Sequence, residues 1–155
     1  MANSSTKLPI VVAHYDRGQD STGKVAPFHW SVLIPVSPAG VDAYAYQVLG
    51  NMDTFEFPNA MVEPSFAKHS AYRGAVVVGG VSESELSIVN EVAARVPVHR
   101  HRDDWNCQNW VIAFLERLKP FGFVPANVTE SGIRNELMEQ EKKWQVADLV
   151  YGETA

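Results

Sequence analysis

The chain has 155 residues, of which 46% are hydrophobic and 20% are charged, a composition typical of one globular domain that buries a core. The formal net charge of −5, without a broad basic patch, argues against a nucleic-acid partner. No apolar run is long enough to cross a bilayer, and the first residues lack a signal-peptide pattern. One cysteine excludes an intramolecular disulfide and fits a reducing compartment, so we expect a cytoplasmic protein.

The first part of the chain is predicted to be rich in strands. Residues 1–7 are small and polar and are expected to form a flexible tail before a single α+β domain over residues 8–155. Strands are predicted at residues 9–15, 28–34, 43–49 and 74–79, with a short further strand at 54–57. The strands at 28–34 and 43–49 are expected to pair as a hairpin. The polar, irregular segment 59–73 is expected to lie over a cleft.

Helices are predicted in the second part. Apolar periodicity favours helices at residues 84–95, 107–118 and 129–144. Ser82 and Glu85 have the spacing of a capping box for the first of them. Pro120 ends the second, because proline cannot continue a helix. The predicted fold is therefore an antiparallel sheet packed against a cysteine-bearing helix.

Cys107, the only cysteine, begins the second helix. Asn106 or Asp104 is a suitable N-cap. In the first helical turn, the positive end of the helix is expected to lower the pKa of the thiol. A lone cysteine in this position is a candidate nucleophile if a histidine lies beside it. Cys107 also shares an apolar stripe with Trp110, so the same pattern fits an ordinary buried core thiol.

His29 is the best placed of the five histidines to act as the base, because it begins a strand that the pattern makes central. An imidazole facing the thiol would take its proton and later protonate the leaving group. The backbone N–H of Cys107 is the leading candidate for an oxyanion hole. Gln47 is the preferred third residue to orient the imidazole, since it points away from the face of Tyr46; Asn51 is the alternative.

Two motifs carry a resemblance to a known fold. Residues 28–33 read Phe-His-Trp-Ser-Val-Leu, and residues 106–110 read Asn-Cys-Gln-Asn-Trp. In this order they resemble the circularly permuted papain-like fold of lecithin–retinol acyltransferase-like enzymes and PPPDE-type desumoylating isopeptidases. The resemblance implies that Cys107 is the nucleophile and His29 the base. Gln108 and Trp110 depart from the isopeptidase motif.

The acyltransferase branch of that fold has a second histidine on the strand that follows. Here no histidine lies between His29 and His69, so the resemblance leaves a role for Gln47 or Asn51, or a Cys–His dyad as in the isopeptidase branch. Many members of the acyltransferase branch also carry a membrane anchor, for which this sequence shows no candidate.

The predicted activity is that of a cysteine-dependent hydrolase or acyltransferase. It would cleave an amide, isopeptide or (thio)ester bond of a peptide, isopeptide or acyl substrate through an acyl-enzyme on Cys107, without a cofactor or metal. Four side chains are predicted to line the substrate pocket: Trp30, Tyr46, Gln108 and Trp110. Aromatic residues at such spacings also occur in cores, and their burial decides between the two. The oligomeric state stays open.

Two alternatives remain at this point. His99 and His101 alternate on one face of an extended segment close to Cys107, which is a weak pattern for a zinc site. The second alternative is a non-catalytic interaction module that retains the fold and has Cys107 as a core residue. Segment 59–73 and the charged last helix would then serve a partner. Thiol reactivity separates the enzyme from the module, because a core cysteine is inert.

Overall fold

The structure is a computed structural model that describes residues 7–19, 22–36 and 42–152. Five strands form one antiparallel sheet in the order β4-β3-β2-β1-β5. In chain order they are β1 (Lys7–Tyr15), β2 (His29–Pro35), β3 (Ala43–Tyr46), β4 (Met61–Glu63) and β5 (Tyr72–Ser82). The helices are α1 (Leu86–Arg95), α2 (Cys107–Leu118) and α3 (Glu130–Gly152), with short 3₁₀ turns η1 (Phe66–Lys68), η2 (Glu83–Glu85) and η3 (Lys119–Phe121). The predicted α+β class with an antiparallel sheet is confirmed.

The strand that begins with His29 lies at the centre of this sheet. β2 pairs with β1 on one side and with β3 on the other, which confirms the predicted hairpin between β2 and β3. Alternation sends Trp30 and Val32 into the core shared with the helices, whereas Leu33 belongs to a second cluster on the opposite face. Each face of β2 is therefore covered by a different set of side chains.

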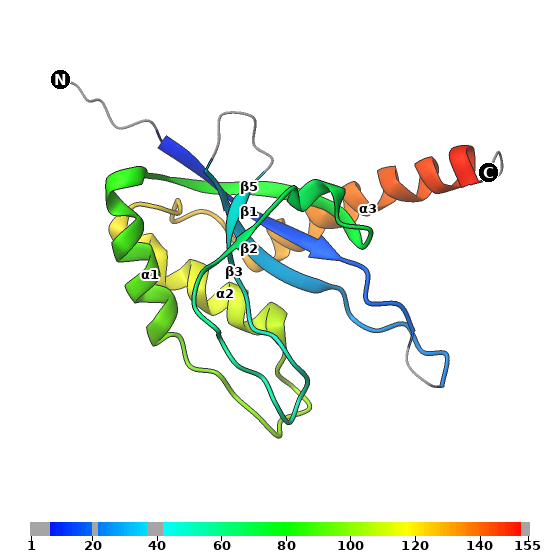
Figure 1. Cartoon of the computed structure of the whole chain (residues 1–155), viewed down its shortest axis with the longest axis horizontal. Helices are drawn as coiled ribbons and strands as arrows, with labels where there is room; N and C mark the ends of the chain where they lie inside the picture. The colour runs from blue at the N-terminus through cyan, green and yellow to red at the C-terminus, as the bar shows by residue number, and fades with distance from the viewer. Residues whose placement is uncertain (1–6, 20–21, 37–41, 153–155) are drawn as a thin grey trace.

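Helices cover one face of the sheet. α2 packs against β2 and α1, and α3 packs along β5 (Figure 1). Figure 1 also shows the C-terminal turns of α3 extending past the end of the sheet. Buried side chains of α2 fill this core, among them Trp110, Phe114 and Leu118. Within the described residues, no helix combines the length and the apolar character needed to cross a membrane.

The other face of the sheet is covered by the segment around η1. Its small cluster consists of Val11, Ala13, Tyr15, Leu33, Ala43, Ala45 and Phe66. Several of these side chains are very short, so the covering segment cannot close completely onto the sheet. The prediction that segment 59–73 lies over a cleft is confirmed by a cavity that His69 and Ala71 help to line.

Several boundaries differ from the predictions. β3 ends at Tyr46 rather than at residue 49, because the chain turns at Gly50, whose φ of 110° suits glycine. The predicted strand at 54–57 is wrong: only Glu56 pairs, in an isolated bridge with Leu49. The fourth strand instead lies at Met61–Glu63, inside the segment that was expected to be irregular.

The ends of the domain also differ. Lys7, expected in the tail, begins β1, and the rest of the predicted tail lies outside the described residues. α3 continues to Gly152 rather than ending at residue 144. The predicted capping box is not formed, because the Ser82 hydroxyl donates directly to the Glu85 carboxylate at 2.6 Å.

Candidate active site

The start of α2 is held by a reciprocal pair of asparagine side chains. Asn106 Oδ1 accepts from the backbone N–H of Gln108 at 2.8 Å, and Asn109 Oδ1 accepts from the backbone N–H of Asn106 at 2.8 Å. Asp104, the alternative cap, binds Arg102 instead. This arrangement satisfies amides that a helix start leaves free, and it fixes Cys107 as the first helical residue.

The Cys107 sulfur lies where α2 meets the central strand. Its side chain is buried, with 2% of the residue exposed. The sulfur accepts from the backbone N–H of Trp30 and from the N–H groups of Gln108 and of Cys107 itself, and each contact lowers the pKa of the thiol. Burial acts more strongly in the opposite direction and raises that pKa above its usual range. The expectation of a lowered pKa is therefore wrong, because desolvation outweighs the helix end.

His29 is held by the predicted third residue. Its Nε2 lies 2.7 Å from Gln47 Oε1, an acceptor, so the ring donates its Nε2 proton and keeps a free electron pair on Nδ1. Burial lowers the pKa of His29, the Gln47 contact opposes this, and the nearby Arg17 lowers the pKa further. Asn51 does not share this position, because its side chain accepts from the backbone N–H of Asp53 within its own turn.

Cys107 and His29 are linked through Trp30 and through Arg17. Trp30, whose N–H contacts the sulfur, directly follows His29 in the chain, and Arg17 lowers the pKa of both groups. β3 separates from β2 beyond the Val32–Tyr46 pair, which leaves this end of β2 open to the start of α2. Among the described residues, no hydrogen bond joins the His29 ring to the sulfur.

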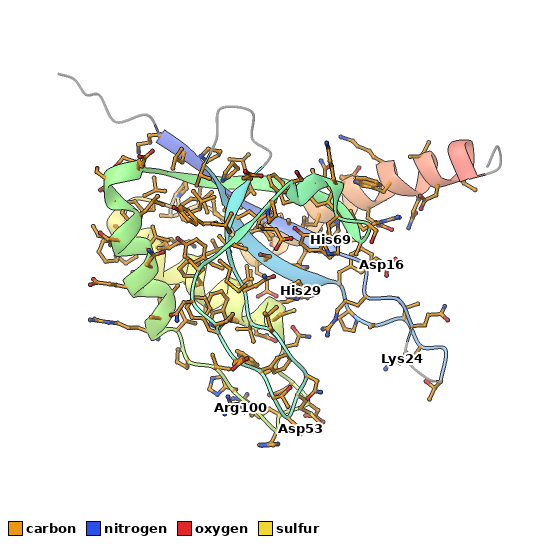
Figure 2. The ribbon with its side chains drawn as sticks, viewed as in Figure 1. Asp16, Lys24, His29, Asp53, His69 and Arg100 are labelled. Atoms are coloured by element: carbon orange, nitrogen blue, oxygen red, sulfur yellow. The ribbon has the colours of Figure 1, made fainter. Side chains whose placement is uncertain are left out.

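Two cavities lie on opposite faces of β2. A cavity of about 310 Å³ opens on the outer face and is lined by His29, Ser31 and Gln47, among others. Figure 2 labels His29. A second, of about 280 Å³, lies on the helix side and is lined by Trp30 and Gln108, among others. Cys107 lines neither of them. Residues next to Cys107 in space or in sequence, Trp30 and Gln108, line the helix-side cavity.

Gln108 links the start of α2 to the residue before His29 and to α3. Its side-chain Nε2 donates to the backbone oxygen of Phe28 at 2.8 Å, and its Oε1 accepts from Arg134 at 2.8 Å. The Arg134 guanidinium also lies over the Trp30 ring, 4.6 Å from its centroid. Trp30 and Gln108, both predicted to line a pocket, do line the helix-side cavity. Gln108 in addition fixes the start of α2 against the residue before His29.

The other two predicted pocket residues are core residues, and that prediction is wrong for them. Tyr46 and Trp110 are both completely buried. Tyr46 faces α2, where its ring lies 5.5 Å from that of Phe114, and its hydroxyl donates to Asn90 at 2.6 Å. Trp110 stacks on Phe57 at 5.1 Å. Both side chains point between sheet and helix, where packing leaves no room for a substrate.

The two histidines of the zinc-site alternative have other contacts. His101 Nδ1 pairs with Asp53 at 2.9 Å on the exposed surface, and His99 packs its edge against Trp105. Among the residues that the structure describes, no group of three or more His, Cys, Asp or Glu side chains is arranged to hold a metal ion.

Several residues near the site were missed by the sequence reasoning. The outer cavity is also lined by Tyr15, Asp16, Glu63 and His69, and the helix-side cavity by Arg134. The sequence carried one signal for the outer cavity: Ser31 shares the face of His29, and short side chains recur on that face. The others come from segments far apart in the chain, and only the fold brings them together.

Comparison with known proteins places the chain in a family. Residues 18–125 match the model of DUF6540, a family of unknown function. The chain belongs to this family. The DUF6540 match contains His29, Gln47 and Cys107, whereas β1 and α3 lie outside it. No curated protein and no solved structure matches the chain.

Proposed function

We propose that this DUF6540 protein is a cysteine-dependent hydrolase or acyltransferase with a permuted papain-like arrangement, which cleaves an amide, isopeptide or (thio)ester bond. The observation that carries the proposal is the 2.7 Å contact between His29 Nε2 and Gln47 Oε1. It fixes the ring in the tautomer that a base requires. The Cys107 sulfur contacts the N–H of the very next residue, Trp30. A peptide, isopeptide or acyl compound in the cytoplasm is the proposed substrate.

The first step joins the sulfur to the substrate carbonyl carbon. His29 Nδ1 takes the proton of the Cys107 thiol while the sulfur forms its bond to that carbon. The carbonyl electrons move onto its oxygen, where the backbone N–H of Cys107 at the helix start would stabilise the negative charge. When the carbonyl re-forms, the bond to the leaving group breaks, and the imidazolium gives its proton to that group.

The second step releases the acyl group. Water or another acceptor attacks the thioester and loses its proton to His29 Nδ1, and the sulfur leaves and recovers that proton. Gln47 keeps its contact with Nε2 throughout, which holds the ring in one orientation and supports the positive charge when it forms.

Cys107 and His29 are both neutral before a substrate binds. Burial raises the pKa of Cys107 and lowers that of His29, so near neutral pH the pair is a thiol and an imidazole rather than an ion pair. Proton transfer would then accompany the attack on the substrate. A substrate that excludes water from the site would also strengthen the contacts with the backbone N–H groups.

The test uses p-nitrophenyl acetate as a simple acyl donor. We expect release of p-nitrophenolate together with one acetyl group on Cys107, detected by mass spectrometry. Cys107→Ala and His29→Ala should lose this acylation. His69→Ala is the matched control, because His69 lines the same outer cavity but makes no contact with Gln47 among the described residues. Acylation that is unchanged in His29→Ala would overturn the proposal.

A non-catalytic interaction module is the second candidate. The 2% exposure of Cys107 and its raised pKa favour it, because a core thiol is buried and stays protonated. In that case Cys107 would react with iodoacetamide only after unfolding, and the acyl donor would leave the native protein unmodified.

A further inference from the structure

The cavity on the outer face of the sheet has the form of a small-molecule site. Its volume of about 310 Å³ lies at the lower end of the range for such sites. The short side chains of Ser31, Ala45 and Ala71 leave the space, and the segment that follows η1 covers it. Figure 2 shows His29, His69 and Asp16 lying in this region.

Ser31 supplies an unused hydrogen-bonding group there. Only 1% of this residue is exposed, and its hydroxyl has no hydrogen-bond partner among the described residues. A buried hydroxyl without a partner destabilises the protein, because it has given up its bonds to water. Ser31 lines the cavity, so an occupant that displaces the side chains covering this hydroxyl would restore the missing hydrogen bond.

The charges around the cavity are negative. Two carboxylates line it, Asp16 and Glu63, and no lysine or arginine does so among the described lining residues. Burial raises the pKa of the Tyr15 hydroxyl, and Glu63 lies near enough to this group to raise it further. Arg17 acts on His29, which makes Glu63 a more favourable partner for a cation than the surroundings of His29.

Aromatic rings line the same space. The ring of Tyr15 lies 5.5 Å from that of His69 and 6.1 Å from that of His29. His69 Nδ1 accepts from the backbone N–H of Ala71 at 3.1 Å, which holds this ring in place. A tyrosine face beside a carboxylate attracts a positive group, because the ring quadrupole and the charge act in the same direction. Leu33 and Leu49 provide apolar contact area.

We propose that this cavity binds a small organic ammonium ion, with a primary alkylammonium as its simplest form. The ammonium group would donate to the Glu63 carboxylate and to the Ser31 hydroxyl, and its alkyl part would contact Leu33 and Leu49. A carboxylate ligand is disfavoured, because Asp16 and Glu63 would repel it. This binding goes beyond the proposed hydrolase activity and does not require Cys107.

The experiment is a titration of the full chain with n-butylammonium chloride, followed by amide chemical shifts in ¹H–¹⁵N NMR spectra. We expect saturable shifts at Ser31, Gln47 and Ala71, and a dissociation constant in the millimolar range. n-Butanol and sodium butyrate have similar size and differ in charge, so they are the matched probes. Each should bind about tenfold more weakly, the difference expected of one hydrogen bond to a charged group.

Variants assign the binding to this cavity. Glu63→Gln keeps the size of the side chain and should weaken n-butylammonium binding about tenfold. Ser31→Ala should also weaken it, yet leave the free protein equally or more stable, because it removes a hydroxyl without a partner. Glu136→Gln is the control for a carboxylate that lies away from this cavity, on α3.

The outcomes separate this inference from the enzymatic one. Cys107→Ala should bind n-butylammonium as the unchanged protein does, whether or not the acyl donor reacts with the thiol. Equal binding of all three probes, or binding that Glu63→Gln and Ser31→Ala leave unchanged, would overturn the ammonium site. Butyrate binding more tightly than n-butylammonium would show that the cavity prefers anions and would also overturn it.

Discussion

Replacing Gln47 with alanine tests the arrangement on which the proposed chemistry depends. The substitution removes the acceptor that lies 2.7 Å from His29 Nε2. It leaves a part-buried N–H without its partner, at a cost of about 1–3 kcal/mol in the free energy of unfolding. Water can enter the outer cavity and replace part of the contact, so we expect about 1–2 kcal/mol, or about 2–8 °C in melting temperature for a chain of this length.

The effect on reactivity should be larger than the effect on stability. A ring that is free to turn presents Nδ1 in the correct direction for only part of the time, so we expect acylation of Cys107 by p-nitrophenyl acetate to fall about tenfold or more. Gln47→Glu keeps an acceptor in place and should restore acylation. It should also raise the pKa of His29, because a carboxylate stabilises the imidazolium, and this can be followed by NMR titration.

Asn51→Ala is the matched control for Gln47→Ala. It removes hydrogen bonds to Asp53 and Thr54 in a nearby exposed turn, and so destabilises the chain without touching His29. We expect a lower melting temperature with unchanged acylation. If Gln47→Ala were acylated as fast as the unchanged protein, His29 would not depend on Gln47 and the reasoning would fail.

The remaining predictions concern the thiol and the packing. Alkylation of native Cys107 by iodoacetamide should accelerate only above the ordinary thiol pKa of about 8.5, because burial raises the pKa of this thiol. The free energy of unfolding should fall over the same pH range, since the thiol of the unfolded chain ionises first. An alkylation rate that already levels off near neutral pH would contradict this prediction. Phe114→Ala should lower the free energy of unfolding by about 3–5 kcal/mol in urea titrations, because the ring is completely buried between Tyr46 and Trp110. Gly79→Ala would place its Cβ 2.1 Å from the backbone oxygen of Phe123, so we expect the free energy of unfolding to fall by about 1–3 kcal/mol or more. An unchanged free energy of unfolding would show that the backbone shifts to accept the methyl group.

The sequence predicted the elements whose periodicity is strong. The apolar stripe from Cys107 to Leu118 predicted α2, because an asparagine is a suitable cap at its start and Pro120 limits its end. Alternation in β2 correctly separated Trp30 from His29. The parity of Gln47 placed it on the face of His29, and the structure brings the two side chains into contact.

Weak local signals explain the errors in the strands. β4 has three residues and is held by pairing with β3, so its own sequence carries little information. Residues 54–57 have strand-forming composition, but the turn at Asn51 directs them away from the sheet. Tyr46 and Trp110 were assigned to a pocket because aromatic residues suit pockets and cores equally well, and only their burial decides between the two.

By itself, the sequence determined the fold class, the central place of the strand that begins with His29 and the position of Cys107 at a helix start, and it favoured Gln47 over Asn51 as the partner of His29. These follow from periodicity and capping, which act between residues close together in the chain. Only the tertiary structure decided the protonation of Cys107, because desolvation depends on every group packed around the sulfur. It alone also assembled the outer cavity, since Tyr15, Ser31, Glu63 and His69 come from distant segments that meet only when the sheet forms.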